Sequence, residues 1–290
     1  MPNSLNNIER ASTIIEALPY IQKFRGKVVV IKYGGNAMIS PELSDAVMED
    51  IIMLYLMGIK VVLVHGGGPE INDMLKKIGK KSEFINGLRY TDEETMSVVQ
   101  SVLCGKVNKD LVATIVRKGG RAMGLCGMDN GLLSAKALDR GDGVDYGLVG
   151  EIVEVNADVL NDAMENNYIP VVATVAHGID GNNSYNVNAD TAAAKIASAL
   201  HAEKLILLTD TQGVLKDPSD PSTLIKRIYL YQIKRYIDDG VVTGGMIPKL
   251  TCCAEAISGG VTRTHILDGR VPHSIIIEML TDEGAGTMIL

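Results

Sequence analysis

The sequence predicts an α/β fold in which helices cover both faces of a parallel or mainly parallel sheet. Short segments rich in Val, Ile and Leu alternate along the chain with longer segments of helical periodicity. Glycine clusters such as Gly34-Gly35 and Gly66-Gly67-Gly68 follow strand-like segments and precede helical ones. Alternating strands and helices form such sheets, and ligands bind at the carboxyl ends of the strands. We therefore expect the glycine clusters to meet at one edge of the sheet.

The amino-terminal segment predicts an amphipathic helix, Asn7 to Phe24, which Pro19 should kink. The apolar side chains that share one side of this helix are Ile8, Ile14, Ile15, Leu18 and Ile21. Strands are then expected at Lys27–Lys32 and Lys60–Val64, with a helix at Ser44–Leu56 between them.

A further helix should begin near Pro69, because proline is favoured in the first turn of a helix. A long helix follows, capped by Thr91 or Asp92 and reaching about Lys118, with Glu94 as the capping-box partner of Thr91. The remaining elements expected, in chain order, are glycine-rich strand-like segments over 122–155, a helix from a cap at Asn156 to about Asn166, a strand at Tyr168–Ala173, a helix at Asp190–Leu200 capped by Asn188, a strand at Lys204–Leu208, a loop at 216–221, helices at Gln232–Asp239 and Ile247–Ser258, and a strand at Arg263–Leu267.

No stretch rich in Pro or Ser marks a linker between domains. We expect the boundary between two lobes near residues 174–182, where His177 to Gly181 indicates a loop.

Composition and charge exclude several classes of protein. The net charge of −7 and the pI of about 5.3 argue against nucleic acid as a general partner. The four cysteines show no C-x-x-C spacing and no histidine pair has metal-ligand spacing, so we expect reduced thiols and no protein metal site. Met1 to Arg10 does not resemble a signal peptide, and no apolar run is long enough to span a membrane. We expect a soluble cytoplasmic protein.

Two glycine clusters suggest binding of phosphate. Lys32 ends a strand before Gly34-Gly35, whose amides can cradle phosphate oxygens, although a surface lysine before a turn is the simpler interpretation of this motif alone. Gly66-Gly67-Gly68 repeats the pattern after the next strand, and a flexible turn is there the less favoured alternative. His65 is expected to be structural and to satisfy a buried hydrogen bond. The sequence contains neither a P-loop nor a Gly-x-Gly-x-x-Gly fingerprint, so any phosphate chemistry uses another nucleotide fold.

Polar residues later in the chain complete the candidate site. Alternation predicts Asn186 and Asn188 on one face of a strand, with Asp190 starting the next helix. A helix cap at Asn188 and a solvent-facing Asp190 are the alternatives. Thr209-Asp210 ends a buried strand, and Lys249 lies one turn into a helix after a glycine pair, although most helix lysines are simply exposed.

In this order, five motifs resemble those of the amino acid kinase family, and within it the branch that acts on N-acetyl-L-glutamate. The similarity runs from about Lys27 to Thr287. The motifs are Lys32-x-Gly34-Gly35, His65-Gly66-Gly67-Gly68, Asn86-Gly87-Leu88-Arg89, Asn186-x-Asn188-x-Asp190 and Gly245-Met246-x-x-Lys249.

The resemblance implies an open αβα sandwich with a mainly parallel central sheet and two lobes. Residues 26–176 would bind the acyl amino acid, residues 177–290 would bind ATP and arginine, and residues 1–25 would form an oligomerisation helix. The implied reaction is ATP-dependent phosphorylation of the γ-carboxylate of N-acetyl-L-glutamate in arginine biosynthesis, with Mg²⁺ held mainly through the ATP phosphates.

The resemblance also implies a role for individual residues. Lys32 and Lys249 would stabilise the transferring phosphoryl group, and Asp190 would hold both lysines. The residues implied to bind the acyl amino acid or the phosphoryl group are Gly35, Gly67, Gly68, Arg89, Asn186 and Asn188. The residues implied to lie around ATP are Thr209, Asp210, Gly213, Thr243, Gly245 and Met246.

The extra amino-terminal helix resembles that of arginine-sensitive members of the family, in which such helices interlace dimers into a hexamer, a trimer of dimers. L-Arginine would then be a feedback inhibitor bound by Tyr20, Glu278 and Gly284. The alternative is that the helix packs on its own subunit.

Two other functions stay open from the sequence. The chain could phosphorylate another carboxylate or phosphate, such as aspartate, glutamate, carbamate or a nucleoside monophosphate. It could also be a non-catalytic sensor of arginine or nucleotide, although Lys32, Asp190 and Lys249 argue against this.

Overall fold

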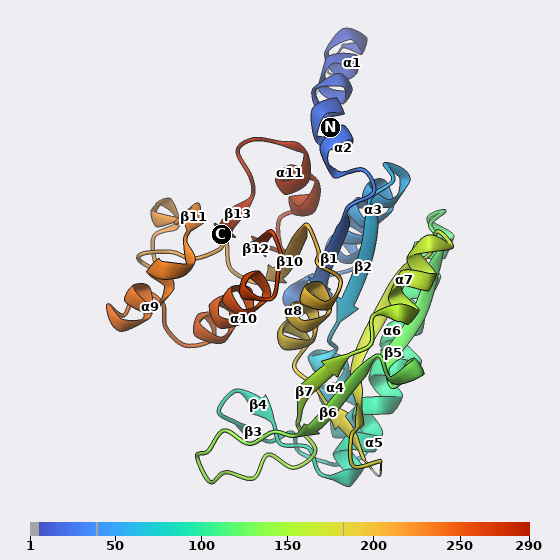
Figure 1. The fold of residues 1–290 in the computed structure, drawn as a ribbon, viewed down its shortest axis with the longest axis vertical. Helices are drawn as coiled ribbons and strands as arrows, with labels where there is room; N and C mark the ends of the chain where they lie inside the picture. Colours follow the sequence, from blue (N-terminus) through green and yellow to red (C-terminus); the bar gives the residue numbers. More distant parts are fainter. Residues whose placement is uncertain (1–5, 39, 182) are drawn as a thin grey trace.

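A computed structural model describes residues 6–38, 40–181 and 183–290, and it confirms a mainly parallel sheet with helices around it (Figure 1). In these residues an 11-stranded sheet has the main order β11-β13-β12-β10-β1-β2-β8-β6-β7, and β5 and β9 also pair with β8. The central parallel strands are β1 (Val28–Tyr33), β2 (Lys60–His65), β8 (Ile169–Gly178), β10 (Lys204–Thr209) and β12 (Arg263–Asp268).

The outer strands are of both directions. Strands β5 (Ala122–Gly127) and β6 (Leu133–Ala137) run parallel to β8, and β11 (Arg227–Ile228) runs parallel to β13. Antiparallel pairs join β7 (Gly150–Val155) to β6, β9 (Ser184–Asn186) to β8, and β13 (Gly286–Ile289) to β12. A separate hairpin consists of β3 (Phe84–Ile85) and β4 (Leu88–Arg89).

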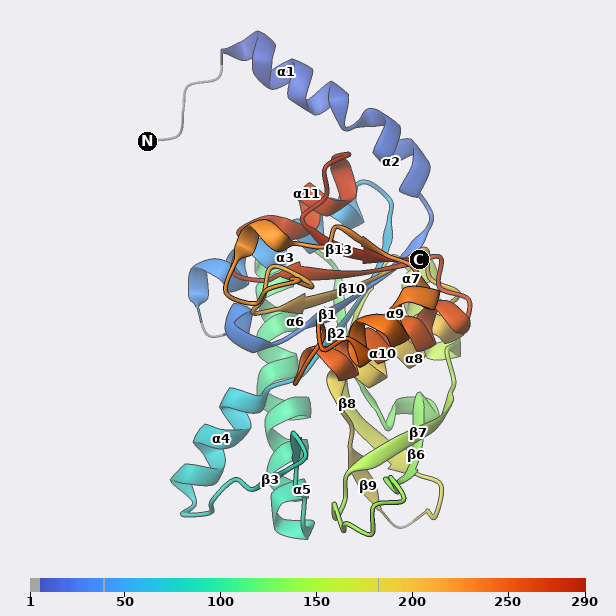
Figure 2. The same cartoon turned by 90° about the vertical axis from the view of Figure 1, so that its left-hand side faces the viewer.

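Alternation along the central strands gives the sheet two apolar faces. In β1, Val30 packs into a cluster with Ile196 of α8 (Ala189–Ala199) and Leu250 of α10 (Met246–Ser258). Val29 and Ile31 point to the opposite face, into a cluster with apolar residues of α3 (Pro41–Leu56), α6 (Asn108–Arg117) and α11 (Ser274–Leu280). Helices therefore cover both faces of the sheet, as Figure 2 shows. Further helices are α4 (Gly68–Lys77), α5 (Glu93–Gln100), α7 (Asp158–Glu165) and α9 (Leu230–Asp238), with short 3₁₀ turns at Gly35–Met38, Asp129–Gly131 and Pro221–Thr223.

The long helix expected up to Lys118 is present, but its middle third, Ser101–Val107, is π-helical and joins α5 to α6. Asp92 is its N-cap and accepts a hydrogen bond from the Thr95 amide at 2.8 Å. The predicted capping box between Thr91 and Glu94 is wrong. The hydroxyl of Thr91 donates to the Arg89 carbonyl, and the carboxylate of Glu94 pairs with Lys80.

Strand β8 is longer than its sequence pattern predicts. It continues to Gly178 because its first half pairs with β2 and β5 and its second half with β6 and β9. The loop expected from His177 therefore begins only after Gly178. The cap expected at Asn156 is displaced by one residue, since Ala157 is the N-cap of α7. The division of the chain into two lobes stays a prediction.

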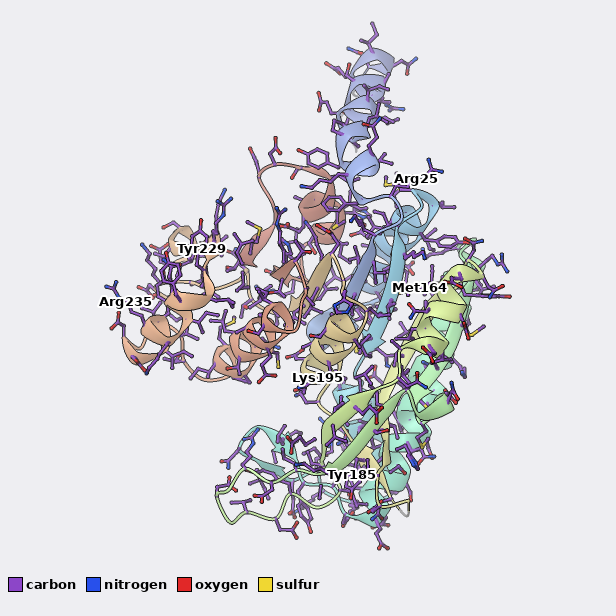
Figure 3. All side chains as sticks on the ribbon, viewed as in Figure 1. Arg25, Met164, Tyr185, Lys195, Tyr229 and Arg235 are labelled. Atoms are coloured by element: carbon purple, nitrogen blue, oxygen red, sulfur yellow. The ribbon has the colours of Figure 1, made fainter. Side chains whose placement is uncertain are left out.

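The amino-terminal helices confirm the predicted kink. Helix α1 (Asn7–Glu16) ends at Glu16 with Ala17 as its C-cap, and α2 (Leu18–Phe24) carries Pro19 in its first turn. Helix α1 has no buried residue, and Ile8 is 79% and Ile14 70% exposed. Figure 2 shows α1 standing away from the body, and Figure 3 shows its side chains projecting into open space. The alternative in which this helix packs on its own subunit is therefore wrong for α1.

No helix in the described ranges is both long and apolar enough to cross a membrane.

Candidate active site

The carboxyl ends of three neighbouring strands meet at one edge of the sheet. Lys32 of β1 lies opposite Leu207 of β10, and Tyr33 of β1 lies opposite His65 of β2. Gly34-Gly35 directly follows Tyr33, and Gly66 to Gly68 directly follows His65. Strand β10 ends two residues after Leu207, at Thr209, and Asp210 comes next. The expected convergence of the glycine clusters is thus confirmed. Gly35 has a φ of +69°, a left-handed conformation that favours glycine at the start of the 3₁₀ turn.

A buried carboxylate holds two lysines at this edge. Asp190, in the first turn of α8, lies 3.0 Å from Nζ of Lys32 and 2.6 Å from Nζ of Lys249. The side chains of Lys32, Asp190 and Lys249 are 11%, 13% and 22% exposed. Burial alone would raise the pKa of Asp190, but the charges of the two lysines outweigh it and lower that pKa. The alternatives of a solvent-facing Asp190 and an exposed Lys249 are therefore wrong. Three separate elements bring these residues together.

His65 fixes the second glycine cluster. It is fully buried, its Nδ1 lies 2.8 Å from the Gly66 carbonyl oxygen, and its Nε2 lies 3.1 Å from Nδ2 of Asn108. Nδ1 must carry the proton, because a carbonyl only accepts, and Nε2 then accepts from Asn108. Burial lowers the pKa of His65 to about 4, so its imidazole is neutral at pH 7. The predicted structural role of His65 is confirmed.

The glycine at position 67 is required by close packing. A Cβ there would lie 2.7 Å from Cδ2 of Leu103, in the π-helical segment. The strand-to-helix turn can thus approach Leu103 only without a side chain at Gly67.

A cleft of about 180 Å³ lies beside the turn. Its lining includes five of the residues implied to bind the acyl amino acid: Gly67, Gly68, Arg89, Asn186 and Asn188. Apolar residues also line the cleft: Leu88 of the Asn86–Arg89 motif, and Ile71, Phe84, Leu103, Val149 and Val187, which the sequence did not single out. The cleft therefore combines donors suited to an anion with an apolar wall suited to an aliphatic chain.

Arg89 is held from several sides. It is 7% exposed, its guanidinium lies 4.8 Å from the centroid of the Phe84 ring, and it donates to the hydroxyl of Ser82 and to the Gly68 carbonyl. Asn86 and Gly87, both with positive φ, form the turn of the β3–β4 hairpin that carries Arg89. An Asn-Gly pair between strands is a strong hairpin signal, so this sequence feature could have predicted the element.

Asn188 does not share a strand face with Asn186, because β9 ends at Asn186. Its side-chain oxygen accepts from the amides of Asp190 at 2.9 Å and Thr191 at 3.2 Å. The helix-cap alternative for Asn188 is therefore correct, although the residue also lines the cleft.

The residues implied to lie around ATP fall into separate groups in the structure. Thr209 and Asp210 follow β10 at the edge of the sheet, and Gly245 is the N-cap of α10, with Thr243 and Met246 beside it. Packing explains why a glycine stands at position 213, since a Cβ there would lie 2.6 Å from Oγ1 of Thr287. None of the six belongs to the cleft lined by Arg89 and Asn186.

The residues implied to bind arginine lie near α2 and α11. Glu278 contacts Nζ of Lys204 at 3.2 Å and Nδ1 of His265 at 2.9 Å, and it accepts from the Ala285 amide. Burial would raise its pKa, but the hydrogen bond to His265 and the charge of Lys204 lower it to about 2. A Cβ at Gly284 would lie 2.8 Å from Oε2 of Glu278.

Tyr20 lies on α2, and a hydrogen bond to Asp282 raises the pKa of its phenol. The same helix carries Phe24, whose ring centroid lies 5.0 Å from Nζ of Lys204. Lys204 was not predicted as a site residue, because a lysine that begins a buried strand carries no motif.

Among the described residues, no group of three or more His, Cys, Asp or Glu side chains could hold a metal ion. The most buried carboxylate of the candidate site, Asp190, is already paired with two lysines.

Comparison with known proteins gives consistent results. Residues 27–268 match the model of the amino acid kinase family. The chain is 58% identical to the acetylglutamate kinase of Clostridium beijerinckii, covering 98% of this chain and 99% of that one, and 52% identical to that of Heliobacterium modesticaldum, covering 99% of each.

Two solved structures have a similar fold. An N-acetylglutamate synthase of Neisseria gonorrhoeae, complexed with coenzyme A and N-acetyl-glutamate, matches with a TM-score of 0.84 at 26% identity, over 96% of this chain and 63% of the synthase chain. A carbamate kinase of Giardia lamblia bound to AMP-PNP matches with a TM-score of 0.64 at 18% identity, over 91% of this chain and 98% of that one, and supports the fold alone.

Proposed function

The chain belongs to the amino acid kinase family, and we propose that it transfers the γ-phosphoryl group of ATP to the γ-carboxylate of N-acetyl-L-glutamate in arginine biosynthesis. The observation that carries this proposal is the Lys32–Asp190–Lys249 cluster at the sheet edge that also borders the cleft of Arg89 and Asn186. The relatives named acetylglutamate kinase support the choice of acceptor. The protein acts in the cytoplasm, where ATP is available.

The chemistry suits this site because it needs no strong general base. A carboxylate is already ionised at pH 7, so its oxygen can attack the γ-phosphorus directly while the bond to ADP breaks. The barrier comes from bringing two anions together in line. Lys32 and Lys249 neutralise the equatorial oxygens of the transferring group, and the amides of Gly35, Gly67 and Gly68 donate to it.

Arg89 and Asn186 orient the acceptor by binding its α-carboxylate, with Asn188 nearby. Thr209, Asp210, Gly213, Thr243, Gly245 and Met246 surround ATP in this proposal. Mg²⁺ enters as part of the MgATP substrate and is held mainly through the ATP phosphates.

The direct test is turnover of the purified protein with ATP and a panel of acceptors: N-acetylglutamate, glutamate, aspartate, carbamate and nucleoside monophosphates. We expect ADP to be produced when N-acetylglutamate is the acceptor and not with the other acceptors. Turnover with another acceptor would change the substrate, and no turnover with any acceptor would leave a sensor as the better interpretation.

Replacing Arg89 by lysine should raise the KM for N-acetylglutamate more than the KM for ATP. The charge is kept, but the planar fork that binds a carboxylate with two parallel hydrogen bonds is lost. Steady-state kinetics with each substrate varied in turn measures the effect. Equal increases in both KM values would remove Arg89 from the acceptor site.

We also propose that L-arginine inhibits the enzyme and that the chain assembles into a hexamer, as a trimer of dimers. The exposed apolar residues of α1 support an intermolecular contact, because such a stripe is otherwise left in water. Tyr20, Glu278 and Gly284 lie on α2, on α11 and after α11. A ligand held between them would link α2, in the amino-terminal segment, to α11 and would bias two states of the assembly.

Deleting residues 1–24 should give an active dimer that arginine does not inhibit. Separately, Glu278→Ala should weaken inhibition by arginine with little loss of activity. Light scattering and rates with and without arginine measure both effects. A full-length protein that is a dimer, or a rate that arginine leaves unchanged, would contradict the regulation and leave the kinase proposal intact.

A further inference from the structure

We propose that Thr91 is a positioning residue that fixes both groups for the α-carboxylate, Arg89 and Asn186, through its single hydroxyl. This inference rests on the proposed function. Thr91 lies two residues after Arg89, belongs to none of the five motifs and is fully buried. Its hydroxyl donates to the Arg89 carbonyl at 2.8 Å and lies 3.1 Å from Nδ2 of Asn186.

The proton count of this hydroxyl fixes the orientation of the Asn186 amide. A threonine hydroxyl has one proton, and a carbonyl oxygen can only accept, so the proton lies towards Arg89. The hydroxyl then acts as an acceptor towards Asn186, which must present its NH₂ group. One N–H of that group is used on Thr91, and the other is available to donate to a carboxylate. In the opposite orientation the amide oxygen would lie near the acceptor anion and repel it.

The backbone around Thr91 is held by the loop between β6 and β7. The Thr91 amide donates to the Tyr146 carbonyl at 3.3 Å, and the Leu148 amide donates to the Thr91 carbonyl at 2.6 Å. The Asn186 amide in turn donates to the Leu148 carbonyl at 2.9 Å. The backbone of Leu148 thus links the backbones of Thr91 and Asn186. The hydrogen bond between the Thr91 hydroxyl and the Asn186 side chain joins the same two residues a second time.

One further hydrogen bond holds this loop against the β3–β4 hairpin. The Tyr146 hydroxyl accepts from Nδ2 of Asn86 at 2.9 Å and donates to Asp142 at 2.7 Å. Gly147 has a φ of +65°, and a Cβ there would clash with the Thr91 carbonyl oxygen. Figure 1 shows the loop beside the hairpin. The hairpin, the loop and β9 therefore meet at Thr91, and their geometry determines how Arg89 and Asn186 face the cleft.

Thr91→Val tests the hydroxyl with little change of shape, and Thr91→Ser is the matched control that keeps it. Thr91→Val should raise the KM for N-acetylglutamate about tenfold or more, because the Asn186 amide is then free to turn and the Arg89 carbonyl loses a buried partner. The KM for ATP should stay within about twofold of its original value. Thr91→Ser should restore nearly the original KM for N-acetylglutamate.

The inference would be overturned if Thr91→Val left the KM for N-acetylglutamate unchanged, raised both KM values equally, or behaved like Thr91→Ser. Thr91→Cys, with a weaker donor, replaces Thr91→Val if the valine variant does not fold, and the same increase in KM is expected. An unaltered protein without turnover on N-acetylglutamate would refute the proposed function itself, whereas failure of this inference appears only in the variants.

Discussion

Replacing Lys32 or Lys249 by alanine is expected to lower kcat by about 10²-fold to 10³-fold while the protein keeps its fold. Each lysine is oriented by Asp190 and largely withdrawn from water, at 11% and 22% exposure of the side chain. A cation held in this way stabilises charge that develops in the transition state without reorganising first, and losing one such donor costs about 3–4 kcal/mol of the barrier. Because the contact strengthens as the phosphoryl group moves, kcat should fall more than either KM rises. Steady-state kinetics of both variants measures this.

Lys195→Ala is the matched control for the lysine variants. Lys195 lies on α8, the helix that begins next to Asp190, but its side chain is exposed (Figure 3). Its removal should leave kcat within about twofold of the original value, since an exposed cation is screened and has no fixed partner here. Near-normal turnover of Lys32→Ala or Lys249→Ala would show that the phosphoryl group is stabilised elsewhere.

Local sequence patterns predicted most of the central elements, because burial on both faces of a parallel sheet leaves a strong signal. The strands that end at Tyr33 and His65 and the helix capped by Asn188 lie close to their predicted limits. The sequence motifs also identified residues that lie together in the structure. Lys32, Asp190 and Lys249 form one cluster, as the resemblance implied.

The sequence did not predict features that depend on contacts between distant segments. The extension of β8 to Gly178 depends on its pairing with β6 and β9. Thr91 has the residue type of a helix cap, and only the position of Asn186, 95 residues away in the chain, gives its hydroxyl another role. Lys204 belongs to no motif, and its partner is Glu278, which lies on a helix 74 residues later. Pairing partners of this kind are not encoded by periodicity.

Asp190 makes the two lysines a single unit, so its replacement should have the largest combined effect on rate and stability. Asp190→Asn keeps the size of the side chain but leaves two cations close together without their shared anion. We expect kcat to fall by about 10²-fold or more, because both lysines lose their fixed direction. We also expect the free energy of unfolding to fall by about 3 kcal/mol at pH 7, the usual scale for removing one partner of a buried ion pair. Kinetics and urea unfolding measure the two effects.

The pH dependence of the stability difference identifies its cause. The charges of Lys32 and Lys249 lower the pKa of Asp190 in the folded state, so its contribution is complete above the ordinary aspartate pKa of about 4. That contribution is lost as the pH falls through the folded-state pKa, which lies below this value. The gap between the unaltered protein and Asp190→Asn should therefore narrow below pH of about 4. Asp158→Asn, which removes an exposed first-turn carboxylate from α7, should change neither kcat nor stability by much. Equal losses in the Asp158 and Asp190 variants would mean that Asp190 acts only through the helix dipole and does not organise the lysines.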